Sequence, residues 1–280
     1  MTGIIANEMA GMNNMIAWND TDESSTSFYI GGFLNPFDAA LCALILCGTF
    51  TTLTWEENYG DIESKNIDHP NTRGFTRTLK NALTTTLRNS DILVCGLVSA
   101  LFEGSMYVFV FMWTPMLTAL TEKDSPSGEV NLPFGLIFAS FMVNCMIGSS
   151  LFSIVIEKMR VEKLGIYVLF VGSLSMLAIF VASTDTSSFI AMNVFEICVG
   201  MYFPIMGTMK SSIVPESQRA AIYNIYRVPL NFIVLASLLT NLPPNVAFLV
   251  NTIMLATASF LQMKLKHSRM ASSPGALESV

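Results

Sequence analysis

Long apolar runs separated by short polar segments dominate the chain from residue 36 onward. A helix needs about 20 consecutive apolar residues to cross the hydrocarbon core of a bilayer. Seven runs reach or approach this length, and they cover residues 36–55, 92–117, 132–156, 164–183, 187–209, 220–239 and 245–263. The pattern predicts an all-α transmembrane fold of seven helices, surrounded by a lipid bilayer.

The basic residues set the orientation of these spans. When the loops are assigned alternately to the two sides of the membrane, thirteen of the 15 Lys and Arg residues fall on one side. The exceptions are Lys123, on the opposite side, and Arg227, inside a span. Since short loops rich in Lys and Arg stay in the cytoplasm, we expect residues 1–35 to lie outside and the tail 264–280 to be cytoplasmic. Asn19 opens an Asn-Asp-Thr tripeptide in the outside segment, which makes it a glycosylation candidate.

The spans form two groups separated by residues 56–91. This long segment mixes acidic and basic residues and holds turn-forming residues near its centre, so we interpret it as a cytoplasmic connector and not a folded domain. The connector divides a first transmembrane helix at 36–55 from a six-helix transmembrane half at 92–263.

Composition supports a membrane protein and excludes several classes of site. Hydrophobic residues make up 52% of the chain and charged residues 13%, whereas soluble domains carry about a quarter charged residues. The 5 cysteines lie inside apolar runs with no Cys-x-x-Cys spacing, and the 2 histidines lie outside the runs. We therefore expect no metal site, no cofactor, no enzymatic activity and no nucleic-acid partner.

Three ionisable residues lie near the middle of predicted spans, namely Glu103, Glu196 and Arg227. A charge at this depth costs about 2.5–3.5 kcal/mol on insertion scales, so each one is a candidate for substrate or proton handling. Two interpretations stay open. Arg227 either pairs with Glu196 or Glu103 and holds helices together, or it handles substrate or protons directly. If Glu103 has no cationic partner, desolvation favours its neutral form and allows proton exchange.

Polar neighbours extend these candidates into helical faces. Asn224, Arg227 and Asn231 follow one another at i, i+3 and i+7, and Tyr223 precedes Arg227 by four residues. Tyr107 follows Glu103 by four residues in the same way. Such faces must line a cavity or meet a polar partner helix, and a guanidinium beside amides and phenols suits an oxyanion.

Prolines lie inside three spans, at Pro115, Pro204 and Pro229. Broken helices are common where a transporter gates, so these residues are gating candidates. Ordinary packing kinks are the alternative, because transmembrane helices tolerate proline.

Four sets of motifs resemble one known family. They are Trp-Glu-Glu-Asn-Tyr-Gly at 55–60; Leu-Phe-Glu-Gly-Ser-Met-Tyr at 101–107 with Met-Trp-Thr-Pro at 112–115; Gly-Met-Tyr-Phe-Pro at 200–204 with Gly-Thr-Met-Lys-Ser at 207–211; and Ile-Tyr-Asn at 222–224 with Arg-Val-Pro-Leu-Asn at 227–231. In this order the motifs are similar to those of the molybdate-anion transporter family of the major facilitator superfamily, and the resemblance runs from about residue 35 to residue 266.

The resemblance implies a carrier of twelve helices in two six-helix halves, with a substrate cavity between the halves. The implied function is uptake of molybdate, a tetrahedral dianion, across the plasma membrane. Matched by motif, Glu103, Tyr107, Glu196, Arg227 and Asn231 belong to the C-terminal half of that cavity. An arginine in the cavity suits the charge of the substrate.

The chain departs from the family at its N-terminal end. Its first span corresponds to the sixth helix of the carrier, residues 3–8 resemble the end of the fifth, and helices one to four have no counterpart in this sequence. The seven spans are therefore expected to be helix six plus the C-terminal six-helix half, with an N-terminal half or a second chain as a partner.

Three other classes of membrane protein are alternatives to a transporter. A non-transporting membrane subunit or regulator built from a half-carrier stays open. A seven-helix receptor is disfavoured, because the loop at 56–91 is too long and no external cysteine pair exists. An intramembrane enzyme is disfavoured because no span contains histidine or a paired catalytic aspartate.

Overall fold

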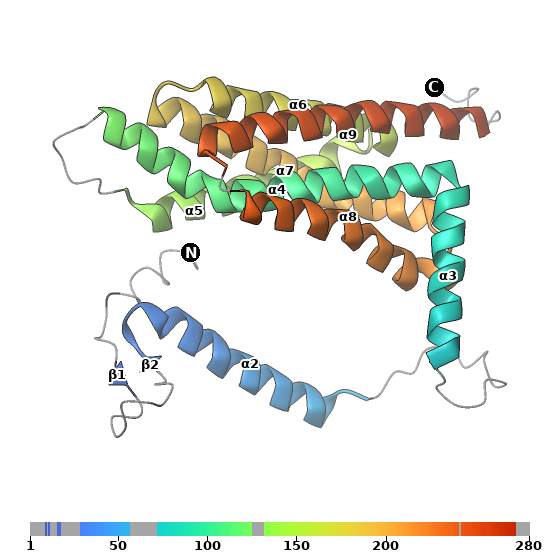
Figure 1. Ribbon diagram of the computed structural model, residues 1–280, viewed down its shortest axis with the longest axis horizontal. Coiled ribbons are helices and arrows are strands. Elements are labelled where there is room, and N and C mark those ends of the chain that lie inside the picture. The colour runs from blue at the N-terminus through green and yellow to red at the C-terminus, as the bar shows by residue number, and fades with distance from the viewer. Residues whose placement is uncertain are drawn as a thin grey trace. The chain divides into compact units, whose positions relative to one another are not determined.

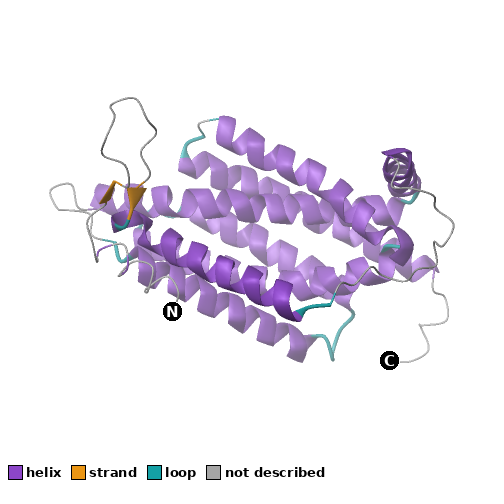
Figure 2. Cartoon of the chain, turned by 90° about the horizontal axis from the view of Figure 1, so that it is seen from below, coloured by secondary structure: helices purple, strands orange, loops and turns teal. Residues whose placement is uncertain are grey.

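Helices account for nearly all the regular structure of this chain (Figure 2). The computed structural model describes residues 9, 11, 16–17, 29–56, 72–124, 132–240 and 242–272. In chain order the elements are β1 (Ile16–Ala17), β2 (Tyr29–Ile30), η1 (Gly32–Leu34), α2 (Asn35–Thr54), α3 (Thr72–Arg88), α4 (Ser90–Asp124), α5 (Phe134–Val155), α6 (Val161–Val181), α7 (Asp185–Ile213), η2 (Glu216–Gln218), α8 (Arg219–Leu239) and α9 (Pro244–Ser272).

The seven predicted spans are confirmed as helices. Among the described residues, 7 helices are long and apolar enough to cross a membrane, and each coincides with one predicted run. Several of these helices are longer than their apolar run. α9 continues to Ser272, well past the predicted end at residue 263. The reason is visible at Leu265, which is buried between the exposed Lys264 and the half-buried Lys266. A helix that keeps one packed face can continue among charged residues.

The helix α3 was not predicted. It occupies the second half of the segment at 56–91, which we had interpreted as a connector, while residues 57–71 lie outside the described part of the chain. Figure 1 shows α3 crosswise to α4. The burial of Ala82 and Thr86, one helical turn apart, explains why a polar and basic segment forms a helix here. A search for continuous apolar runs misses such a helix, because its apolar residues alternate with polar and basic ones.

The chain divides into two units, the first made of residues 1–70 and 133–139. Within it, β1 pairs with β2 in antiparallel register, Ile16 opposite Ile30. The Gly31 N–H donates to the Asp38 carboxylate at 2.9 Å, which ties the turn before α2 to the first turn of that helix. No residue of α2 is buried within the structure, as expected for a helix whose surroundings are lipid or another chain.

The second unit, residues 71–132 and 140–280, has α4 at its centre. α4 packs against α7, α8 and α9, and α6 packs against α7 and α9. Aromatic rings fill the space between them. Phe102 of α4 stacks on Tyr202 of α7 with ring centroids 3.7 Å apart, and Phe109 lies 5.0 Å from Phe195 and 6.3 Å from Phe248.

Hydrogen bonds between helices supplement this packing. The Asn251 amide of α9 donates to the Ser105 carbonyl of α4 at 3.1 Å, and the Gln262 amide donates to the Glu162 carbonyl at 3.3 Å. Both amides are fully buried. In a bilayer, where burial of apolar surface gives little net attraction between helices, such bonds help to specify which helices meet.

α5 and α7 cross with their backbones almost in contact. A Cβ atom added at Gly200 would meet the Cys145 carbonyl, and one added at Gly148 would meet the Ile197 carbonyl. Small residues at a crossing permit this approach.

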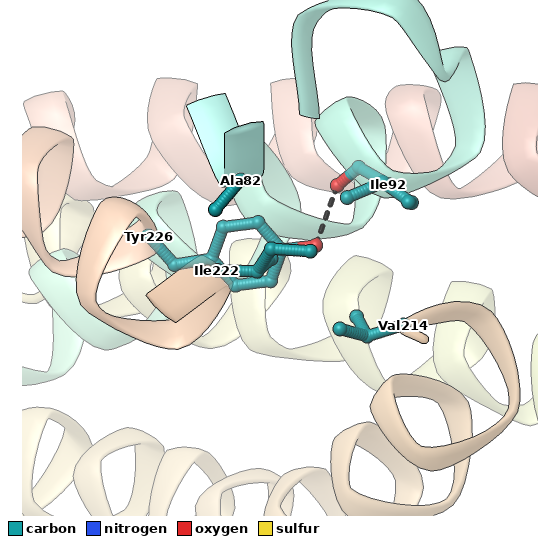
Figure 3. Close-up of a cluster of buried hydrophobic side chains, with 5 residues drawn as sticks. All are labelled: Ala82, Ile92, Val214, Ile222 and Tyr226. Carbon is teal, nitrogen blue, oxygen red and sulfur yellow. Dashed lines mark hydrogen bonds between the residues drawn. The ribbon is translucent and has the colours of Figure 1, made fainter. Parts of the chain in front are cut away.

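A cluster of five buried residues joins α3 to the bundle (Figure 3). Its members are Ala82, Ile92, Val214, Ile222 and Tyr226. The Tyr226 hydroxyl donates to the Ile92 carbonyl at 2.7 Å, so α8 is bonded to the first turn of α4. This cluster fixes the part of α8 that carries the candidate residues.

Candidate functional site

Glu103 is the centre of a polar cluster between α4 and α7. Its Oε1 atom accepts hydrogen bonds from the Ser99 hydroxyl at 2.7 Å, the Tyr202 hydroxyl at 3.1 Å and the Lys210 ammonium at 3.2 Å. Ser99 lies one turn before Glu103 on α4, whereas Tyr202 and Lys210 both come from α7. The carboxylate is therefore held by two neutral donors and one cation.

The ion pair of this cluster is enclosed on most sides. The side chains of Lys210 and Glu103 are 19% and 24% exposed. The prediction that Glu103 exchanges protons depended on its having no cationic partner, and this condition is not met.

Lys210 is a site residue that the sequence reasoning missed. The apolar run ends at residue 209 and so predicts a cytoplasmic loop at Lys210, but α7 continues to Ile213 and the Lys210 side chain is only 19% exposed. Its ammonium also lies 5.7 Å from the centre of the Tyr223 ring. The motif Gly-Thr-Met-Lys-Ser at 207–211 contained the signal, since it joins this lysine to the span.

Arg227 lies on an open face of α8 together with Asn224 and Asn231. All three side chains are exposed, as the spacing of i, i+3 and i+7 predicts for one side of a helix. Within the described residues, Arg227 makes no ion pair and no hydrogen bond through its side chain. The interpretation in which Arg227 pairs with Glu103 or Glu196 is wrong for this part of the chain, because Glu103 is bonded to Lys210 instead.

Tyr223 connects the open face with the enclosed cluster. It lies one turn before Arg227 on α8 and faces Lys210, and its ring is 6.2 Å from that of Tyr226. Tyr107, one turn after Glu103, is 43% exposed. The structure thus brings Glu103, Lys210 and Tyr223 together. Arg227 lies one helical turn beyond Tyr223 on α8.

Glu196 is the least solvent-exposed of the three charged candidates. Its side chain is buried on α7, with 6% of the residue exposed. Over the described ranges it has no ion-pair partner, and Arg227 and Glu103 are not bonded to it. The structure therefore separates Glu196 from the other two charged candidates.

The three prolines lie inside continuous helices. α4 runs through Pro115, α7 through Pro204 and α8 through Pro229. The helical turns on both sides of each proline continue, which agrees with the packing kinks given as the alternative, and the gating role stays a prediction. A proline still removes one backbone hydrogen bond, so each remains a weak point in its helix.

Two further expectations fall outside this cluster. Asn19, the glycosylation candidate, lies outside the described residues. For metal binding, the described residues contain no group of three or more His, Cys, Asp or Glu side chains placed to hold an ion.

The arrangement offers two cations with different surroundings, Lys210 on α7 and Arg227 on α8. Lys210 is engaged by a carboxylate, and Arg227 is free within the described part of the chain. The aromatic ring of Tyr223 lies beside the first and one turn from the second.

Comparison with known proteins links this geometry to a family of carriers. Residues 24–202 match a family model described as sugar transporters with 12 transmembrane segments. A molybdate-anion transporter of Xenopus tropicalis is 33% identical over 211 residues, which are 72% of this chain and 42% of that protein.

Two further relatives carry the same description. The molybdate-anion transporter of Danio rerio is 28% identical over 230 residues, covering 74% of this chain and 46% of the relative. That of Takifugu rubripes is 26% identical over the same length. The chain therefore spans less than half the length of the curated relatives that it matches.

Proposed function

Because the chain belongs to the molybdate-anion transporter family of the major facilitator superfamily, we propose that it forms one wall of a carrier for tetrahedral oxyanions such as molybdate. Uptake into the cell across the plasma membrane, with the C-terminal tail in the cytoplasm, is part of this proposal. The other wall comes from an N-terminal half or from a second chain.

The observation that carries the proposal is the open face of α8. Arg227, Asn224 and Asn231 are exposed on a helix that is long and apolar enough to span a membrane. A guanidinium facing hydrocarbon costs several kcal/mol, so the face must be covered by a partner or line a water-filled cavity. Its forked N–H donors fit the oxygens of an oxyanion, and the amides add neutral donors.

Lys210 serves as the second cation of the site in this proposal. A dianion beside Tyr223 competes with the Glu103 carboxylate for the Lys210 ammonium, because both offer oxygen acceptors to the same donor. Without the anion, Glu103 neutralises Lys210, and Arg227 keeps its positive charge for the incoming dianion. Binding and release of substrate are then coupled to the breaking and re-forming of one ion pair.

Binding of molybdate to the purified chain in detergent tests the site directly, by isothermal titration. Arg227→Gln removes the forked donors, and we expect affinity to fall about 10- to 100-fold, the equivalent of one lost charge-assisted bond. Arg227→Lys keeps the charge and should recover only part of this loss. Arg219→Gln is the matched control, since Arg219 begins the same helix but pairs with Glu216.

The Glu103 variant gives the sharper test because its expected effect is opposite in sign. Glu103→Gln frees Lys210, so molybdate should bind more tightly than to the wild type, while Lys210→Met should bind it more weakly. Equal affinity in all three proteins would remove Lys210 from the site. Undiminished binding by Arg227→Gln would remove Arg227.

A non-transporting membrane subunit is the second candidate function, favoured by the uncovered polar face of α8. Uptake of molybdate by cells that express the chain separates the two functions. If the chain binds molybdate but supports uptake only together with a partner half, the result supports a function as a subunit. Uptake by the chain alone excludes it.

A further inference from the structure

The helix α3 has an exposed stripe of leucines that the oxyanion site does not use. Leu79, Leu83 and Leu87 repeat every four residues and are 39%, 45% and 63% exposed. On the adjoining side of the helix, Ala82 and Thr86 are buried against the bundle. α3 is therefore anchored along one edge and leaves a second apolar edge uncovered.

The basic residues of α3 border this stripe on its other side. Arg77, Lys80 and Arg88 are exposed, and the helix from Thr72 to Arg88 contains no Asp or Glu. At roughly 100° per residue, the three cations occupy the sector next to the leucines and opposite the buried edge. None of the three forms an ion pair or side-chain hydrogen bond with a described residue. This order of buried, apolar and basic sectors is typical of a helix that lies in a membrane interface.

The leucines also form one wall of an apolar groove between α3, α4 and α8. The groove has a volume of about 350 Å³, and its opposite walls include Leu97 of α4 with Val228 and Pro229 of α8. Its size is within the range of sites for small ligands. Because the accessible wall is entirely apolar, it suits hydrocarbon and cannot hold the oxyanion.

We propose that the groove and the basic sector of α3 together bind one anionic phospholipid, with an acyl chain in the groove and the headgroup on Arg77, Lys80 and Arg88. Charge complementarity favours this occupant over another protein segment, since three cations that have no ion-pair partner among the described residues lie directly beside an apolar groove. The crosswise position of α3 relative to α4 (Figure 1) places these cations at the ends of the spans, where headgroups lie. The proposal is independent of the oxyanion site.

Native mass spectrometry of the complete 280-residue chain tests the proposal. The purified chain in detergent is offered palmitoyl-oleoyl phosphatidylserine or phosphatidylcholine at equal concentration. We expect the wild type to retain phosphatidylserine at least about tenfold better, because each cation near an anionic headgroup contributes measurably. The triple variant Arg77→Gln/Lys80→Gln/Arg88→Gln should lose this preference.

A matched control removes the same charge elsewhere. Lys158→Gln/Lys163→Gln/Lys264→Gln changes three exposed lysines outside α3 and should keep the preference. Leu97→Trp fills the groove and should lower retention of both lipids while the three cations remain. Thermal unfolding of every variant, followed by circular dichroism, confirms that each is folded.

Three outcomes would overturn the proposal. Equal retention of the two lipids by the wild type means that the cations do not select an anionic headgroup. Equal loss in the control variant means that net charge alone is responsible. A mass corresponding to two chains that persists without lipid, and disappears in Leu97→Trp, means that a second copy fills the groove.

Discussion

The helices α7 and α8 both carry charged and polar residues through an apolar span, but they place them in opposite surroundings. On α7, Tyr202 and Lys210 turn into the bundle and are bonded to Glu103 of α4. On α8, Arg227 and its amide neighbours stay exposed, and only the opposite side of the helix packs, through Tyr226. The Tyr202 and Lys210 side chains of α7 have their polar partner within this chain. On the face of α8, Arg227 has no ion-pair or hydrogen-bond partner for its side chain among the described residues.

This difference separates residues that stabilise from residues that are available for binding. Changes on the enclosed side of α7 should lower the free energy of unfolding strongly, whereas changes on the open side of α8 should hardly affect it. Four substitutions test this expectation in detergent, by chemical or thermal unfolding. They run from the most tightly packed position to the most exposed.

Gly200→Ala should produce the largest loss. The added methyl group would meet the Cys145 carbonyl of α5, a backbone atom that cannot move aside without shifting a helix. We expect unfolding to become easier by about 3 kcal/mol, as for an overpacked core position. Gly207→Ala on the same helix is the control, because nothing lies within 4 Å of its added atom. If both variants unfold alike, the close crossing of α5 and α7 is absent.

Lys210→Met should rank second. It leaves the Glu103 carboxylate three-quarters enclosed with only neutral donors, and breaking such a pair is costly. Since the pair retains some solvent access, we expect a loss of about 2 kcal/mol, less than for a fully buried pair. The double variant Glu103→Gln/Lys210→Met removes the stranded charge and should regain most of the stability. A double variant as unstable as the single one would contradict the pairing.

The sequence predicted most of the fold because membrane spans are marked by local hydropathy. Hydropathy did not predict α3 or the C-terminal ends of α4, α7 and α9. There the helices continue through polar residues because one face of each helix stays packed. Among the site residues, the helical face of Asn224, Arg227 and Asn231 followed from spacing alone. The partner of Glu103 did not, because Lys210 lies 107 positions away and only packing brings the two together.

Tyr226→Phe should have a smaller effect than the two α7 variants. It removes one hydroxyl that donates to the Ile92 carbonyl at 2.7 Å inside the cluster of Figure 3. A buried hydrogen bond contributes about 1 kcal/mol, and we expect a loss of that size. Tyr223→Phe is the control on the same helix, since the Tyr223 ring faces Lys210 and keeps that contact without its hydroxyl. Equal stability of Tyr226→Phe and the wild type would show that the α4–α8 bond is dispensable.

Arg227→Gln should have the smallest effect on stability, within about 0.5 kcal/mol of the wild type, as is usual for exposed positions. The same substitution is expected to cause the largest loss of molybdate affinity, so stability and binding should rank the α7 and α8 variants in opposite order. A clear loss of stability in Arg227→Gln would mean that the arginine has a structural partner in the solution state, such as a second copy of the chain. Chemical unfolding measured at two protein concentrations distinguishes this case, because only an arginine buried between chains gives a concentration-dependent midpoint.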